Sequence, residues 1–314
     1  MKKEISKIHP QLLQIANRTP KFDFNKKNLW LMRLIMSIMP KAKTPQSVFI
    51  ENIFIESGQA KIRVRVYKPK MATTPTPVLI WMHGGGYVVG KPEQDDGCCS
   101  QYVQELGITV VSVDYRYAPK YPFPIGLDDC YAALKWVVSQ ARELGIDLNR
   151  IAIGGASAGG GLAAALVQLI YDRQEFKVAL QLLIYPMLDD RTVLRTEIDD
   201  SQNVTWTQKS NQFGWESYLG TACGAKTTPP YAVPARREDL TGLPPVWIGV
   251  GSLDVFYDED LTYAKRLEAS SIETELVVVG GAFHGFDVFD PQIQVVRDFR
   301  NSQIVALRKY LFSS

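Results

Sequence analysis

The order of apolar and polar positions changes near residue 78. Before this point, residues 48–55 and 60–68 have the length and composition of strands. In the second stretch the two kinds of side chain alternate, with Ile62, Val64 and Val66 on one face and Arg63, Arg65 and Tyr67 on the other. This alternation predicts an outer antiparallel strand that faces the core on one side and solvent on the other. Residues 1–45 are predicted to be helical and amphipathic.

Beyond residue 78 the chain carries short, continuous apolar runs. They cover residues 78–82, 109–113, 151–153, 180–185, 246–250 and 275–279. Such runs are typical of strands that are buried on both faces of a parallel sheet. Helical periodicity separates most of them, over residues 126–144, 158–173, 258–269 and 291–311. Strands that alternate with helices predict an α/β fold, in which a mostly parallel, eight-stranded sheet is flanked by helices.

Residues 188–232 interrupt this alternation. They are polar at first and then carry four aromatic side chains at roughly helical spacing, Trp206, Phe213, Trp215 and Tyr218. We interpret them as an insertion that packs with the N-terminal helices to form a cap over the strand ends. Most of the aromatic side chains should form the core of the cap, and one or two should line an acyl pocket. The expected parts are N-terminal cap helices (1–45), core (46–187), cap insertion (188–232) and core (233–314).

Composition narrows the class of protein. The 314 residues carry a formal net charge of +2, which is too small to indicate binding to nucleic acid. The four cysteines form no C-x-x-C pair and are expected to be free thiols: Cys98, Cys99, Cys130 and Cys223. The apolar stretch Leu29–Met39 is too short to span a bilayer, and the first residues do not have the form of a signal peptide. We therefore expect a cytoplasmic protein without stable membrane insertion.

The candidate nucleophile lies in Gly155-Ala156-Ser157-Ala158-Gly159, a G-x-S-x-G pattern. The pattern falls between a predicted strand and a predicted helix. A sharp turn there would expose the Ser157 hydroxyl, and it would require small neighbours such as Gly155 and Gly159. A glycine-rich turn with an incidental serine is the alternative, and the strand–turn–helix setting argues against it.

A second glycine-rich run, His83-Gly84-Gly85-Gly86, follows a predicted strand. Acyl transfer builds negative charge on a carbonyl oxygen, and backbone N–H groups aimed at that oxygen stabilise it. Glycines let the chain approach closely and leave those N–H groups uncovered. A phosphate-binding loop is the alternative, but neither the P-loop nor the dinucleotide-binding pattern is present. A metal at His83 is not favoured, because no other ligands cluster with it in the sequence.

A serine nucleophile needs a base, and the chain has three histidines. His9 lies in a polar N-terminal segment and His83 belongs to the glycine-rich run, so His284 is the candidate base. Asp254, about thirty residues earlier, follows an apolar strand and is the candidate acid that orients His284. Asp258 is the alternative acid, although it is also placed to cap the following helix.

In combination these motifs resemble those of the hormone-sensitive-lipase-like esterases, a bacterial branch of the α/β-hydrolases. Four patterns carry the resemblance: His83-Gly84-Gly85-Gly86-Tyr87, Asp114-Tyr115-Arg116-Tyr117-Ala118-Pro119, the turn at Ser157, and the Asp254/His284 pair. Departures from the family's pattern include Lys120, where a Glu is usual, and Val255-Phe256-Tyr257, where Pro-Leu-Arg is usual. Asp114 and Arg116 are expected to form a buried structural pair.

The resemblance implies that the N–H groups of Gly85, Gly86 and Ala158 form an oxyanion hole beneath a helical cap. Tyr87 joins the cap aromatics as a candidate lining residue of the substrate pocket. The implied activity is hydrolysis of short- to medium-chain carboxylic esters through an acyl-enzyme, with no metal or organic cofactor. The expected partner is a small ester, and the resemblance leaves a homodimer that pairs through a sheet edge open.

The sequence leaves three alternatives to ester hydrolysis as the function. An acyltransferase or amidase would use the same three residues. A membrane-surface lipase would use Leu29–Met39 as an interfacial helix, although we favour a buried cap helix for that stretch. A non-catalytic ligand receptor on the same fold is disfavoured, because the receptors that resemble this family have lost the histidine that His284 represents.

Overall fold

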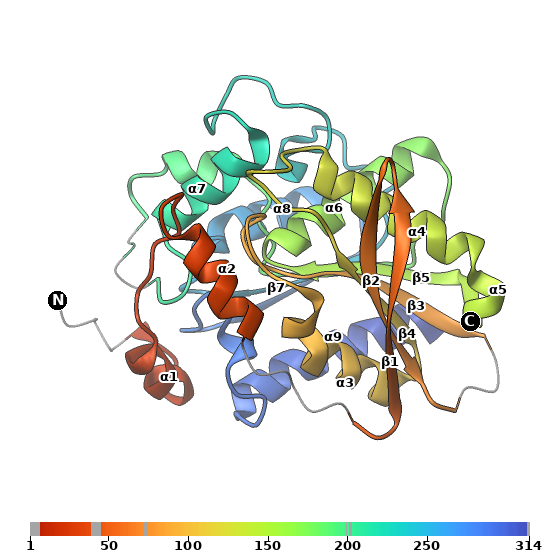
Figure 1. Cartoon of the computed structure of the whole chain (residues 1–314). Coiled ribbons are helices and arrows are strands. Elements are labelled where there is room, and N and C mark those ends of the chain that lie inside the picture. Colours follow the sequence, from red (N-terminus) through yellow and green to blue (C-terminus); the bar gives the residue numbers. More distant parts are fainter. Residues whose placement is uncertain (1–6, 39–44, 72–74, 199, 201–202, 313–314) are drawn as a thin grey trace.

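An eight-stranded sheet lies at the centre of the computed structural model, which describes residues 7–38, 45–71, 75–198, 200 and 203–312 (Figure 1). The strands are β1 (Val48–Ser57), β2 (Ala60–Pro69), β3 (Thr76–Met82), β4 (Thr109–Asp114), β5 (Ile146–Ala156), β6 (Leu180–Ile184), β7 (Val246–Gly251) and β8 (Thr274–Val279). Their order is β1-β2-β4-β3-β5-β6-β7-β8. β2 is antiparallel to β1 and to β4, and the other neighbours are parallel. The predicted α/β fold is therefore confirmed.

Helices cover both faces of the sheet. On one face lie α4 (Ile125–Ser139), α6 (Ala158–Arg173) and α8 (Tyr257–Ala269), and on the other α3 (Asp96–Leu106) and α9 (Gln294–Phe312) (Figure 1). The shorter helices are α1 (Leu13–Arg18), α2 (Leu29–Ile38), α5 (Ala141–Leu144) and α7 (Gln208–Leu219). Short 3-10 helices lie at Pro10–Leu12, Pro92–Asp95, Asp190–Leu194, Pro234–Arg236 and Phe286–Val288. The helix predicted over 126–144 is divided at Gln140 into α4 and α5.

The central strand β3 shows how the sheet builds the core. Val78, Ile80 and Met82 pack into the hydrophobic cluster on one face, and Leu79 and Trp81 into the cluster on the other. All five side chains are buried. Full burial of a large apolar side chain contributes about 1.5–3 kcal/mol. This two-sided burial fixes the strand register, and the register determines which residues leave the sheet at its carboxyl edge.

The N-terminal segment is less helical than predicted. α1 ends at Arg18, because Thr19 is extended and Pro20 cannot continue a helix. Residues 19–28 are not helical, and residues 1–6 and 39–44 of the predicted segment lie outside the described residues. Within the described part of the chain, no helix has the length and apolar character needed to cross a bilayer.

α2 is not buried on all sides, although we favoured a buried cap helix for this stretch. Its residues are mostly apolar, and Arg33 is its one charged residue. Leu29 is buried against the core, but Trp30 on the outer side is 66% exposed. The expectation of burial is wrong for this outer side, because nothing among the described residues covers it.

The helix α3 is missing from the predicted elements, and its presence changes the environment of β2. Arg65 and Tyr67, expected to face solvent, instead contact Asp96 of α3, with hydrogen bonds of 2.8 and 2.7 Å. Both side chains are buried. The expectation of a solvent-facing side is wrong because β1, not β2, is the edge strand and because α3 covers this side of β2.

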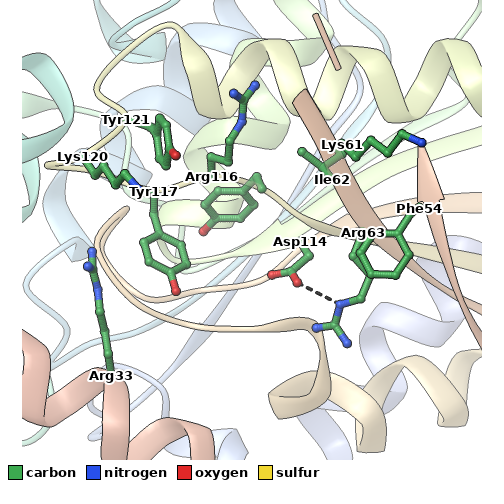
Figure 2. A pocket seen from close by; sticks show the side chains of 11 residues that line it. Arg33, Phe54, Lys61, Ile62, Arg63, Asp114, Arg116, Tyr117, Lys120 and Tyr121 are labelled. Atoms are coloured by element: carbon green, nitrogen blue, oxygen red, sulfur yellow. Dashed lines mark hydrogen bonds and ion pairs between the residues drawn. The ribbon is translucent and has the colours of Figure 1, made fainter. Parts of the chain in front are cut away.

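The expected pair between Asp114 and Arg116 is not formed. Asp114 accepts a hydrogen bond from Arg63 at 2.9 Å (Figure 2). Arg116 instead pairs with the buried Asp129 of α4 at 2.7 Å. β4 ends at Asp114, so Arg116 already belongs to the loop after β4 and lies near α4, whereas Asp114 lies beside β2. Beside this loop lies a cavity of about 510 Å3, whose lining also includes Arg33 of α2 (Figure 2).

Asp95 should make the stability of this fold depend on pH. Its buried carboxylate accepts a hydrogen bond from the Trp81 indole at 2.7 Å. Burial raises the pKa of Asp95 to about 7, against about 3.9 in an unfolded chain. The Asp95 carboxyl group therefore binds its proton more tightly in the folded protein than in the unfolded chain. The free energy of unfolding should fall by up to roughly 4 kcal/mol as the pH rises from about 4 to about 7.

We expect Asp95→Asn to remove this dependence, because an amide does not titrate. Urea unfolding of both proteins at about pH 5 and about pH 8 measures the effect as a smaller change in the variant. Asp290→Asn, at an exposed position, is the matched control and should keep the wild-type change. An equal change in wild type and Asp95→Asn would contradict the prediction.

Candidate active site

Three side chains singled out in the sequence form one hydrogen-bonded chain. His284 Nε2 lies 2.9 Å from Ser157 Oγ, and His284 Nδ1 lies 2.8 Å from Asp254 Oδ2. Ser157 follows β5, Asp254 follows β7 and His284 follows β8. Parallel strands end at the same edge of a sheet, so the fold brings together residues that are far apart in the sequence. In this arrangement a neutral imidazole can take the hydroxyl proton on Nε2 while Nδ1–H donates to the carboxylate.

The turn at Ser157 holds the hydroxyl in a strained backbone conformation. Its φ and ψ are 57° and −123°, and such strain costs about 1–3 kcal/mol in a residue other than glycine. The Ser157 N–H donates to the Ile184 carbonyl at 2.9 Å, which fixes the turn against β6. A Cβ on Gly155 or Gly159 would come within 2.4 or 2.1 Å of a backbone oxygen. The small neighbours that the motif predicted are therefore required by space.

The glycine-rich run borders the same hydroxyl. A Cβ on Gly84 would lie 3.4 Å from the Ser157 Cβ, so this loop passes directly beside the serine. Gly85 and Gly86 have positive φ values of 132° and 58°. A Cβ on Gly85 would lie 1.9 Å from the Val89 carbonyl oxygen, so a larger residue does not fit there.

Ala158 directly follows Ser157 in the chain. It is the first residue of α6, and its N–H therefore has no acceptor within the helix. The N-terminal end of a helix also carries a partial positive charge. An oxygen that becomes negative beside Ser157 would be stabilised by both features.

His83 is buried and held in place by contacts within the protein. Its Nδ1 lies 2.8 Å from the Gly84 carbonyl oxygen, and its ring stacks on Tyr115 at 4.4 Å. The Tyr115 hydroxyl donates to the His83 carbonyl at 2.8 Å. Burial lowers the pKa of His83, which favours the neutral ring. Among the described residues, no group of three or more His, Cys, Asp or Glu side chains is placed to hold a metal ion.

The two candidate acids have different surroundings. Asp254 bonds His284 through Oδ2, and its Oδ1 accepts the Phe256 N–H at 3.0 Å. Asp258 is half exposed and pairs with Arg195 at 2.9 Å. The expectation that Asp258 caps the helix is wrong, because α8 begins at Tyr257 and Asp258 already lies in its first turn. By distance, Asp254 is the acid that reaches the imidazole.

The aromatic residues assigned to the pocket lie in different places. Tyr87, Trp215 and Tyr218 form a buried group, in which Tyr87 stacks on Tyr218 at 4.0 Å and lies 5.3 Å from Trp215. Phe213 is partly buried and packs against the apolar cluster beneath α2. Trp206 lies beside the His284 ring and Gly86.

Trp206 covers one side of the site. Its ring lies 6.4 Å from the His284 ring, and its Cη2 would be 2.0 Å from a Cβ on Gly86. Phe24, from the segment before α2, lies 5.3 Å from the Trp206 ring. Ser157 and His284 are 5% and 9% exposed, so these two side chains are nearly closed off from solvent.

Sequence reasoning missed the residues that hold the His284 ring. Tyr185 and Phe256 meet it edge to face at 4.7 and 5.1 Å. Thr205 donates to its backbone carbonyl, and the Tyr185 hydroxyl donates to Asp287 at 2.7 Å. Phe256 belongs to the segment that departs from the family's pattern. Tyr185 directly follows a buried strand, and this position in the sequence could have indicated that it lies near the site.

This fold and this hydrogen-bonded chain define an α/β-hydrolase. Residues 79–288 match the protein family described as "alpha/beta hydrolase fold". The chain belongs to this family, within its hormone-sensitive-lipase-like esterases, and the resemblance inferred from the motifs is confirmed.

Named relatives cover most of the chain. Esterase LipI of Mycobacterium tuberculosis is 30% identical over 97% of this chain and 95% of its own length. Carboxylesterase NlhH of the same organism is 34% identical over 81% of this chain and 80% of its own length. Among solved structures, the bacterial heroin esterase has a TM-score of 0.91 at 34% identity and covers 98% of this chain and 99% of that one.

Proposed function

We propose that this protein is a serine carboxylesterase in which Ser157, His284 and Asp254 form the catalytic triad. The observation that carries the proposal is the continuous chain of hydrogen bonds, 2.9 Å from serine to histidine and 2.8 Å from histidine to aspartate. Its relatives bear the names of esterases and carboxylesterases, and the activity of the family is ester hydrolysis.

The steps follow from this geometry. Ser157 Oγ attacks the ester carbonyl while His284 Nε2 takes its proton, and Asp254 stabilises the imidazolium that forms. The carbonyl oxygen becomes negative and accepts hydrogen bonds from the N–H groups of Gly85, Gly86 and Ala158. His284 then returns the proton to the leaving alcohol. Water, activated by the same base, attacks the acyl-enzyme and releases the acid.

The remaining site residues belong to a cap in this proposal. α1 and α2 within residues 1–45, together with α7 in residues 188–232, would cover the core parts 46–187 and 233–314. Contacts of Phe24 with Trp206, and of Phe213 with the cluster under α2, support this arrangement. Trp206 would limit the acyl pocket, and Tyr87, Trp215 and Tyr218 would support that wall from behind.

The proposed location of the protein is the cytoplasm.

A preference for short to medium acyl chains follows from the position of Trp206. Each methylene that fits should improve binding by up to about 0.8 kcal/mol until the chain meets the indole ring. We therefore expect kcat/KM for p-nitrophenyl esters to rise from acetate, reach a maximum and fall before palmitate. Trp206→Ala should move the maximum to a longer chain. Trp136→Ala, on α4, is the matched control and should leave the maximum unchanged.

The same measurement tests the alternatives. A steady rise through palmitate, with a jump above the critical micelle concentration, would favour a lipase and contradict this preference. An amidase would cleave the matching anilides at comparable rates. For an acyltransferase, an added alcohol would collect most of the acyl groups in place of water. If the wild-type protein hydrolysed none of the p-nitrophenyl esters, the esterase proposal itself would be contradicted.

A further inference from the structure

The outer side of α2 is an exposed apolar surface. Trp30, Leu31 and Ile35 are 66%, 40% and 42% exposed, and at about 100° per residue they share one side of the helix. The opposite side is packed, with Leu29 and Met36 in the small cluster that includes Val88, Val89 and Ala118. A surface helix of a globular protein normally turns polar residues outward. This helix therefore presents apolar groups where solvent would be expected.

Two basic side chains lie next to this surface in the sequence. Lys26 and Lys27 are exposed in the turn directly before α2. The sequence contains no Asp or Glu between Asp23 and Glu51. This stretch therefore combines an apolar surface with basic side chains and has no acidic residue. It is complementary to a bilayer surface, where negatively charged headgroups cover an apolar interior.

The one charged residue inside α2 is turned toward the protein. Arg33 donates to the carbonyl oxygens of Val88 and Ala118, each at 2.9 Å, and lies 4.7 Å from the ring of Tyr117. Figure 2 shows the Arg33 side chain extending from α2 toward the loop that carries Tyr117. Val88 follows the glycine-rich run closely, so Arg33 ties α2 to the loop beside the reacting serine. The outer side of α2 is left with apolar groups to present.

We propose that α2 docks on the surface of a bilayer that contains anionic phospholipids. Trp30, Leu31 and Ile35 enter the boundary between headgroups and acyl chains, and Lys26 and Lys27 contact lipid phosphates. Tryptophan at this depth and lysine beside it are the usual arrangement of interfacial helices. Docking brings the loop at Gly85 and Gly86 close to esters dissolved in the bilayer. Binding to the bilayer can be measured without hydrolysis, so docking does not rest on the proposed function.

Vesicle flotation of the full chain tests this proposal. At about 0.1 M salt, where the Debye length is about 10 Å, the protein should float with vesicles of phosphatidylcholine and phosphatidylglycerol. It should float at least about tenfold less with phosphatidylcholine alone, or at about 0.5 M salt with either lipid. Failure of the wild-type protein to bind the anionic vesicles would overturn the proposal.

Two variants probe the two components of the surface. Trp30→Gln/Ile35→Gln and Lys26→Glu/Lys27→Glu should each reduce binding by about tenfold or more. Val305→Gln/Phe312→Gln, at exposed apolar positions of α9, is the matched control and should bind like wild type. The lysine variant changes exposed side chains only, so it keeps the test valid if the apolar variant folds poorly.

Two further measurements distinguish membrane docking from a loss of catalysis and from self-association. Hydrolysis of a water-soluble ester should stay within about twofold of wild type in all these variants, which distinguishes a docking defect from a failed esterase assignment. Sedimentation measures self-association through the same surface. If the wild-type protein dimerised without binding vesicles, and Trp30→Gln/Ile35→Gln abolished the dimer, the occupant would be a second copy and the membrane proposal would be wrong.

Discussion

Ser157→Ala should lower kcat for a water-soluble ester by about a millionfold while leaving the protein folded. The hydroxyl lies 2.9 Å from His284 Nε2 and is the proposed nucleophile, so without it no acyl-enzyme can form. Triad residues act as a unit, and loss of the nucleophile removes the contribution of all three, which is the origin of this magnitude. Steady-state hydrolysis of p-nitrophenyl acetate by purified proteins measures the effect.

The fold should tolerate this change. Alanine keeps the Cβ, so the strained backbone at residue 157 is the same in both proteins, and the N–H bond to Ile184 does not involve the hydroxyl. Ser139→Ala, at a serine on α4, is the matched control and should retain full activity. An organophosphate that labels active serines should add its mass to wild type and not to Ser157→Ala. Near-wild-type hydrolysis by Ser157→Ala would exclude this serine as the nucleophile.

The fold was largely readable in the sequence because its signals are local. The run Val78–Met82 is buried on both faces, as its uninterrupted apolar character indicates. The helix predicted over 158–173 begins and ends at the predicted residues, since a glycine-rich turn precedes it. Chain order and strand ends then predicted which side chains meet, because parallel strands all end at one edge of the sheet.

What the sequence did not reveal depends on contacts between distant elements. The spacing of Cys99, Tyr102, Val103 and Leu106 is helical, but nothing local shows that α3 covers β2 and supplies Asp96 to Arg65. The partner of Asp114 comes from β2, 51 residues earlier in the chain, and the partner of Arg116 from α4, the helix that follows β4. The position of Trp206 over Gly86 depends on how an insertion folds back, which no periodicity encodes.

The exposed side of α2 could not be predicted for a different reason. An apolar helix is compatible with burial, with a bilayer surface or with a partner, and the sequence pattern is the same in each case. Only the arrangement of the other described residues shows which side is covered. The packed side carries Leu29 and Met36, and the open side carries Trp30 and Ile35.

Asp254→Asn should lower kcat/KM by about ten thousandfold, whereas Asp258→Asn should leave it within about twofold of wild type. Asp254 Oδ2 accepts a hydrogen bond from His284 Nδ1–H at 2.8 Å, and this bond keeps Nε2 free of hydrogen and facing Ser157. An asparagine would offer its amide N–H to Nδ1 and favour the opposite tautomer. The Nε2 atom would then carry a hydrogen and could not accept the serine proton.

The Asp258 variant is the matched control for this prediction. Both substitutions remove one carboxylate near the start of α8, but Asp258 is half exposed and pairs with Arg195, a contact worth about 0.2–1 kcal/mol at most. Asp258→Asn should therefore lower the thermal midpoint slightly and leave catalysis intact. Asp254→Asn should lose turnover while remaining folded by circular dichroism. The reverse result, with catalysis lost in Asp258→Asn and kept in Asp254→Asn, would mean that the histidine is oriented by the other acid during the reaction. The 2.8 Å contact would then have to be replaced when substrate binds, because Asp258 has its own partner in this structure.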